Sequence, residues 1–178
     1  LAAEFPARGD TAAWLDYNGN DAQGKPVQVN KYHISDDHRL GPLTQRLLYE
    51  LKGPRFLEVL STLTGIPELI PDAHNHGGGI HMSCRGAMLK IHADFNRHPT
   101  WQLDRRLNLL LYLNEDWQTA YGGDLELWDA QMRECVRKVA PVAGRCVVFS
   151  TSSTSYHGHP DPITCPDHLA RKSVALYY

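Results

Sequence analysis

MLKIHADFN, residues 88–96, joins a short run of strand-forming residues to an imidazole and a carboxylate that lie two positions apart. In a β-strand, residues i and i+2 face the same side. His92 and Asp94 can therefore converge on one metal ion, while Ile91 and Ala93 face the opposite way. A histidine and an aspartate at this spacing are common by chance, so the rest of the chain must decide whether they form a metal site.

The residues after this stretch predict an all-β second half. Short β-rich runs are separated by turns that contain Gly, Pro or Asn, and no helical period lies between them. The predicted strands cover residues 88–92, 107–113, 124–128, 136–139, 145–150 and 173–178. Such a series favours an antiparallel sandwich or jelly roll over a parallel α/β sheet.

The residues before position 77 read as helical or irregular. Leu43, Leu47, Leu48 and Leu51 recur at helical spacing after Gly41-Pro42, and a second helix is predicted after Gly53-Pro54. Residues 71–79 end in three consecutive glycines and predict a loop, either a lid over the site or a tight turn. We expect a mainly β protein with flanking helices (α+β), in which helices pack outside a cupin-like jelly-roll core.

Length and composition bound the domain organisation. A chain of 178 residues with 42% hydrophobic residues can bury one sizeable core. We therefore expect a single domain over residues 1–178, with 1–76 as mostly helical support and 77–178 as the catalytic jelly roll. The four cysteines form no C-x-x-C pair, which argues against a zinc ribbon and for free thiols.

The charge pattern excludes some classes of partner. The formal net charge is −2 and no run is rich in Lys or Arg, so nucleic acid is a poor candidate. No stretch approaches the roughly 20 apolar residues of a membrane span, and residues 1–6 lack the pattern of a signal peptide. These features predict a cytoplasmic protein without a membrane partner, and nothing specifies its oligomeric state. Because the chain begins without Met, we expect flanking residues to be missing from it.

A second histidine pair completes a possible metal site. Tyr156-His157-Gly158-His159-Pro160 follows the β-rich region, and either histidine could join His92 and Asp94. Two histidines and one carboxylate form the facial triad of non-haem Fe(II) oxygenases. Such a triad leaves coordination positions open for a 2-oxo acid and O2.

Arg171-Lys172-Ser173 on the last predicted strand can hold the far carboxylate of such an acid. A guanidinium is planar, permanently charged and able to bind a carboxylate through two hydrogen bonds. Arg171 and Ser173 share one face of the strand, whereas Lys172 points away.

Motifs over more than half of the chain resemble the 2-oxoglutarate/Fe(II)-dependent oxygenases, in the branch similar to the prolyl 4-hydroxylase catalytic domain. In order along the chain, these motifs are residues 89–96, 106–108, 112–117, 122–128, 149–151, 157–160 and 171–173.

The resemblance implies a double-stranded β-helix with His92, Asp94 and His157 as iron ligands, because the family's distal ligand directly precedes Gly. It also implies that Arg171, with help from Tyr112 and Ser173, binds 2-oxoglutarate. The implied reaction uses O2 to hydroxylate a small-molecule or peptide substrate and releases succinate and CO2, and ascorbate is a further cofactor of this kind of enzyme. Collagen-type members carry Lys at the clamp and a separate peptide-binding domain, so their protein substrate does not carry over.

Three other functions could use the same residues. A halogenase of this fold needs its carboxylate ligand replaced, which Asp94 disfavours. A cupin-like metal-binding or sensor module, or a zinc hydrolase, needs no cationic clamp such as Arg171. Asn96, Lys90 and Arg85 lie beside the triad strand and could touch substrate or simply be solvated, with Lys90 expected on the face of His92.

Overall fold

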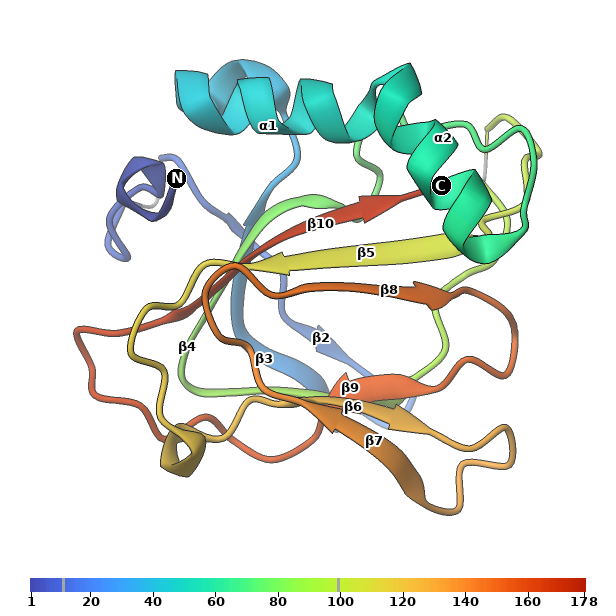
Figure 1. The fold of residues 1–178 in the computed structure, drawn as a ribbon. Coiled ribbons are helices and arrows are strands. Elements are labelled where there is room, and N and C mark those ends of the chain that lie inside the picture. Colours follow the sequence, from blue (N-terminus) through green and yellow to red (C-terminus); the bar gives the residue numbers. More distant parts are fainter. Residues whose placement is uncertain (11, 99) are drawn as a thin grey trace.

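The strand β4 (Gly79–His92) links the two layers of a curled antiparallel sheet (Figure 1). The computed structural model describes residues 1–10, 12–98 and 100–178. The first part of β4 pairs with β3 (Pro26–Ile34) on one side and with β10 (Arg171–Tyr177) on the other. Its last residues pair with β9 (His157–His159) in place of β10, while β3 stays paired as far as Leu89, so one long strand brings residues of both layers together.

Each layer continues from these central strands. β10 pairs with β5 (Leu107–Tyr112), which pairs with β8 (Cys146–Ser150). On the other side, β9 pairs with β6 (Leu125–Trp128), which pairs with β7 (Cys135–Val139). The resulting order β7-β6-β9-β4-β10-β5-β8 forms the predicted jelly-roll core, and the mainly β fold with flanking helices is confirmed.

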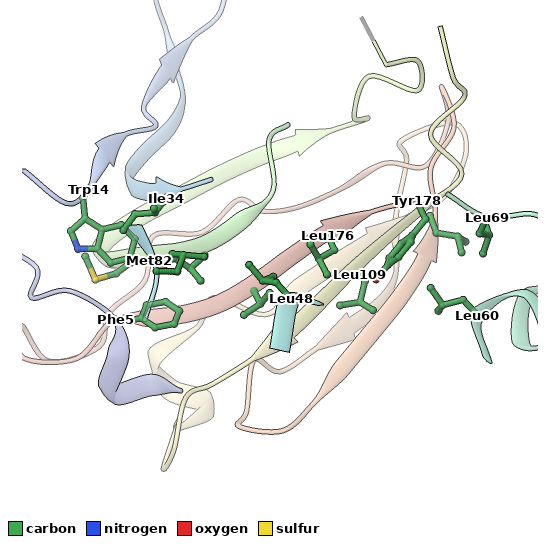
Figure 2. Close-up of a cluster of buried hydrophobic side chains, with 14 of the residues drawn as sticks. Phe5, Trp14, Ile34, Leu48, Leu60, Leu69, Met82, Leu109, Leu176 and Tyr178 are labelled. Atoms are coloured by element: carbon green, nitrogen blue, oxygen red, sulfur yellow. The ribbon is translucent and has the colours of Figure 1, made fainter. Parts of the chain in front are cut away.

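Two helices, α1 (Pro42–Lys52) and α2 (Pro54–Thr64), cover the outer side of the layer that contains β10 and β5 (Figure 1). Both begin at a proline, which suits the first helical position, and Gly65 ends α2 with φ 71°. Leu48 and Leu60 are each 1% exposed and belong to one core with Leu109, Leu176 and Tyr178 (Figure 2). The two predicted helices and their position outside the jelly roll are confirmed.

Strand alternation places the opposite set of side chains inside the curled sheet. On β5 and β10, Asn108, Tyr112, Arg171 and Ser173 alternate with the core residues and are all buried. The apolar outer face therefore anchors the helices, and the inner face presents polar groups to an interior cavity.

The expectation that residues 1–76 are mostly helical is wrong in one respect. Besides short 3-10 turns at Ala2–Glu4 and Asp37–Arg39, this part contains β1 (Leu15–Asp16), β2 (Gly19–Asn20) and the nine-residue β3. Asn30 has φ 50°, and the register of β3 against β4 shifts between Val29 and Lys31. This bulge interrupts the two-residue period, so the sequence of β3 does not read as a strand.

The three glycines before β4 form a close-packed turn. Gly79 has φ 97°, and a Cβ there would lie 2.1 Å from the Ile34 carbonyl oxygen. Gly78 packs against the Ala175 carbonyl oxygen in the same manner. These glycines therefore let the chain enter β4 between β3 and β10. Of the two alternatives for this segment, a lid over the site or a tight turn, the structure has the tight turn.

No helix in the described residues is long and apolar enough to cross a membrane.

Candidate metal centre

His92, Asp94 and His157 meet where β4 and β9 pair. His92 is the last residue of β4, Asp94 follows two positions later, and His157 begins β9 directly opposite His92. His92 Nε2 lies 3.3 Å from Asp94 Oδ1, and His157 Nε2 lies 3.5 Å from Asp94 Oδ2. One donor atom from each residue falls within 4.8 Å of the others, and no second group of this kind occurs in residues 1–10, 12–98 and 100–178.

The other nitrogen of each ring faces a backbone carbonyl. His92 Nδ1 lies 2.9 Å from the Lys90 oxygen, and His157 Nδ1 lies 3.0 Å from the Ser155 oxygen. Since a carbonyl oxygen only accepts hydrogen bonds, each Nδ1 carries the proton and each Nε2 keeps its lone pair. Both lone pairs are thus available to a metal ion beside the carboxylate.

Asp94 is held as a carboxylate. Burial alone would raise its pKa, but the contacts with the His92 and His157 rings and the charge of Arg105 lower the pKa to about 2. Asn108 Nδ2 donates a hydrogen bond of 3.1 Å to Asp94 Oδ2. Burial and the charge of Asp94 raise the pKa of Tyr177, which is hydrogen-bonded to the same carboxylate as a neutral phenol.

His159 lies in the same cavity but outside the cluster. It pairs with Leu89, is 4% exposed, and its Nδ1 has no hydrogen-bond partner among the described residues. Burial, followed by the charge of Arg171, lowers its pKa well below the ordinary value. The geometry therefore favours His157 over His159 as the partner of His92 and Asp94.

Arg171 lines the cavity and forms a buried pair with Tyr112, which is not among the lining residues. Arg171 Nε donates to the Gly123 oxygen at 2.8 Å, and Nη2 donates to the Tyr112 hydroxyl at 3.0 Å. Within the described part of the chain, Nη1 has no hydrogen-bond partner. Ser173 is 1% exposed and lines the cavity beside Arg171, so these three residues can bind one anionic group.

The three suggested substrate residues do not line this cavity. Arg85 donates to the carbonyl oxygens of Thr164 and Cys165 at 3.1 and 3.0 Å, and Asn96 is exposed on the loop after β4. The expectation that Lys90 shares the face of His92 is wrong, because a bulge separates Leu89 from His92 and turns those two side chains inward. Lys90 Nζ instead lies 3.9 Å from Asp21 Oδ2.

Several cavity residues escape prediction from the sequence. Asn108 and Tyr177 extend the same alternation that identifies Tyr112 and Arg171, so the strand period could have found them. Tyr17, Gln28 and Lys31 come from the N-terminal strands, and no motif marks them. His81 lies on the first half of β4, where the sequence predicts no strand.

A curled jelly roll with two histidines, one carboxylate and an inward arginine defines a class of metal-dependent oxygenases. Residues 78–178 match the family described as the 2OG-Fe(II) oxygenase superfamily. The chain belongs to this superfamily.

Three solved structures share the fold. A Pseudomonas putida prolyl-4-hydroxylase is 21% identical, with 78% of this chain and 63% of that chain covered and a TM-score of 0.53. A Trichoplax adhaerens prolyl hydroxylase, solved with a hypoxia inducible factor peptide fragment, is 18% identical, with 94% and 71% covered and a TM-score of 0.60. A prolyl 4-hydroxylase from Phytophthora capsici is 22% identical, with 83% and 46% covered and a TM-score of 0.54.

The chain spans less than two thirds of the Pseudomonas protein and less than half of the Phytophthora protein. No curated protein matches this chain.

Proposed function

We propose that this chain is an Fe(II)- and 2-oxoglutarate-dependent dioxygenase that hydroxylates an organic substrate and releases succinate and CO2. The observation that carries the proposal is that one cavity is lined by the His92–Asp94–His157 cluster and by the buried Arg171. A dicarboxylate can chelate a metal ion at one end and pair with a fixed cation at the other, so this cavity suits a dicarboxylate better than a ligand that binds the metal alone.

In this proposal, the two Nε2 atoms and the Asp94 carboxylate hold Fe(II) from one side. Backbone carbonyls fix both imidazole rings, and Asn108 and Tyr177 orient the carboxylate, so the ligands are positioned before metal binds. Fe(II) supplies the reaction with O2 that amino-acid side chains cannot provide.

Arg171 binds the far carboxylate of 2-oxoglutarate, with Nη1 and the Tyr112 hydroxyl as donors. Burial, the largest influence on Tyr112, raises the pKa of its phenol, so the hydroxyl stays protonated and can donate. Ser173 adds a hydroxyl from the same face of β10. Leu110 and Leu125 line the space around these groups, and apolar walls strengthen charge–charge contacts by excluding water.

The alternatives have less support. A metal-binding module without turnover has no use for the Arg171–Tyr112 pair, and a halogenase would lack the carboxylate that Asp94 provides. We propose a small molecule or a peptide as substrate. A cytoplasmic location, ascorbate as a further cofactor and one domain over residues 1–178 stay predictions.

A mass-spectrometric screen tests the proposal. The protein is incubated in air with Fe(II), 2-oxoglutarate and a panel of free amino acids, proline-containing peptides and small organic acids. We expect succinate in every reaction and a product heavier by one oxygen atom with the true substrate. The matched control is the Asp94→Ala variant, which should form neither. Succinate formation at the same rate by Asp94→Ala and the unaltered protein would contradict the proposal.

A further inference from the structure

Lys31 is a second cation in the cavity, and the proposed reaction does not use it. It extends from β3 on the side of the cavity opposite β5, and it is half-buried. The charged side chains that line the described cavity, histidines apart, are Lys31, Arg171 and Asp94. Asp94 belongs to the metal centre, so no other carboxylate among the described residues that line this cavity can pair with Lys31.

The contacts of Lys31 confirm that its charge is not neutralised. Its Nζ lies 3.3 Å from Gln28 Oε1 and 5.2 Å from the centre of the Tyr17 ring. In the ranges that the structure describes, no carboxylate oxygen lies within 4.0 Å of Nζ. Gln28 Nε2 donates to the Tyr17 carbonyl oxygen, so these two residues are fixed to each other on the same side of the cavity.

A buried ring nitrogen without a partner lines the same cavity. His81 is 6% exposed, and its Nε2 has no hydrogen-bond partner among the described residues. Its ring lies 6.0 Å from that of Tyr17. Burial of an unpaired polar atom is costly, so a donor–acceptor partner is expected there.

With Fe(II) and 2-oxoglutarate bound, the cavity would still carry one net positive charge. The dianionic 2-oxoglutarate offsets the two charges of Fe(II), and Asp94 offsets Arg171. The charge of Lys31 then remains. A half-buried ammonium without a carboxylate partner loses part of its hydration, and a carboxylate from a ligand would offset that loss.

We propose that Lys31, with Gln28 and Tyr17 beside it, forms a subsite that binds a carboxylate group of the primary substrate. This inference rests on the proposed function and names the chemistry that the substrate carries. The substrate would be a small organic acid, such as a free amino acid, or a peptide whose carboxylate reaches the cavity.

The position of Lys31 separates this subsite from the one for 2-oxoglutarate. Lys31 and Arg171 both pair with Ser83, from opposite sides of β4. Their backbones are thus two strand spacings apart, about 10 Å. The Arg171 guanidinium is directed to Tyr112 and Gly123, away from β3.

The test observes the Lys31 ammonium directly by NMR. Protein labelled at lysine Cε and Nζ is loaded with diamagnetic Zn(II) and saturated with 2-oxoglutarate, and acetate or neutral acetamide is then added as the probe. Lys31→Met assigns the signal, and Lys25→Met, which removes an exposed lysine from the turn before β3, is the matched control. We expect acetate to shift the Lys31 signal to saturation and acetamide to leave it in place.

The outcomes are distinct. An unchanged Lys31 signal with acetate, or equal shifts with acetamide, would overturn the subsite. A Lys31 signal that already moves to its limit with 2-oxoglutarate would assign the lysine to the cosubstrate and also overturn it. Failure of 2-oxoglutarate to bind in the same samples would instead count against the proposed function. With the substrate from the mass-spectrometric screen, Lys31→Met should raise KM about 10- to 100-fold and leave the 2-oxoglutarate requirement unchanged.

Discussion

Single residues decide which imidazoles can bind metal. His92 and His157 each have one ring nitrogen fixed by a backbone carbonyl and the other directed at Asp94, whereas His159 has no such arrangement. The sequence leaves His157 and His159 as alternatives because both residues sit at similar distance along the chain from Asp94. Only the register of β9 against β4 places His157 opposite His92.

Removal of each histidine tests this difference. We expect His157→Ala to lower Fe(II) affinity at least 100-fold, because two remaining ligands hold the ion poorly against water. His159→Ala, the matched control on the same strand, should keep stoichiometric iron. Anaerobic Fe(II) titration followed by metal analysis measures both. Full iron occupancy in His157→Ala together with loss in His159→Ala would reverse the ligand choice.

Arg171 is the second residue that can be tested alone. Arg171→Leu should raise the 2-oxoglutarate requirement by about 100-fold or more, given roughly 3 kcal/mol for stranding a buried charge. Arg171→Lys should recover part of the loss, since it restores charge without the planar fork. Iron affinity should change little in both.

Lys172→Leu serves as the control for Arg171→Leu. Lys172 points to the other side of β10, where its Nζ contacts the Ala2 carbonyl oxygen, 3.2 Å away. Titration of 2-oxoglutarate into each iron-loaded variant should show an affinity for Lys172→Leu close to that of the unaltered protein. A normal affinity in Arg171→Leu would place the clamp elsewhere.

Among the elements, β9 holds the two halves of the metal centre together. Gly158 lies against β4, and a Cβ at this position would be 2.7 Å from the Leu89 oxygen and 2.8 Å from the Lys90 oxygen. These contacts are with backbone, so they cannot be relieved by a rotamer change.

We expect Gly158→Ala to push β9 away from β4 and to weaken Fe(II) binding by about tenfold or more, with a stability loss of about 1–3 kcal/mol. Gly9→Ala is the control, because a Cβ there meets nothing within 4 Å. Iron titration and urea unfolding measure the two effects. Unchanged iron affinity in Gly158→Ala would show that the β4–β9 spacing does not position the ligands.

The elements also show where prediction from sequence succeeds. The strands that carry Tyr112, Arg171 and Ser173 follow a regular alternation, so their inward residues can be read directly. β3 and the first half of β4 cannot be read in this way. A bulge at Asn30 interrupts β3. In the first half of β4, the buried residues His81 and Ser83 are polar, so the apolar alternation typical of a strand is missing. The cavity wall that contains Lys31 therefore becomes visible only in the fold.

In the whole molecule, the helical layer and the metal centre lie on opposite faces of one sheet. α1 and α2 pack on the outer side of β5 and β10 (Figure 1). The residues that line the cavity lie on the inner side of these strands. The helices therefore contribute to stability without contact with the proposed ligands.

A pair of leucines on α1 tests this separation. Leu48→Ala should lower the free energy of unfolding by about 2–5 kcal/mol, because Leu48 is 1% exposed in the core (Figure 2). Leu43→Ala, at a site 58% exposed, should change it by less than about 0.5 kcal/mol. Urea unfolding gives both values. If Leu48→Ala folds at the assay temperature yet loses iron affinity, the two faces are coupled.

Joint binding of Fe(II) and 2-oxoglutarate in this cavity underlies the proposed function. Its most direct test is an anaerobic titration of 2-oxoglutarate into iron-loaded protein, followed by visible absorption. We expect a weak charge-transfer band that saturates at one equivalent per chain, is absent in Asp94→Ala, and requires more 2-oxoglutarate in Arg171→Leu. An iron-loaded protein that develops no such band at any 2-oxoglutarate concentration would contradict it.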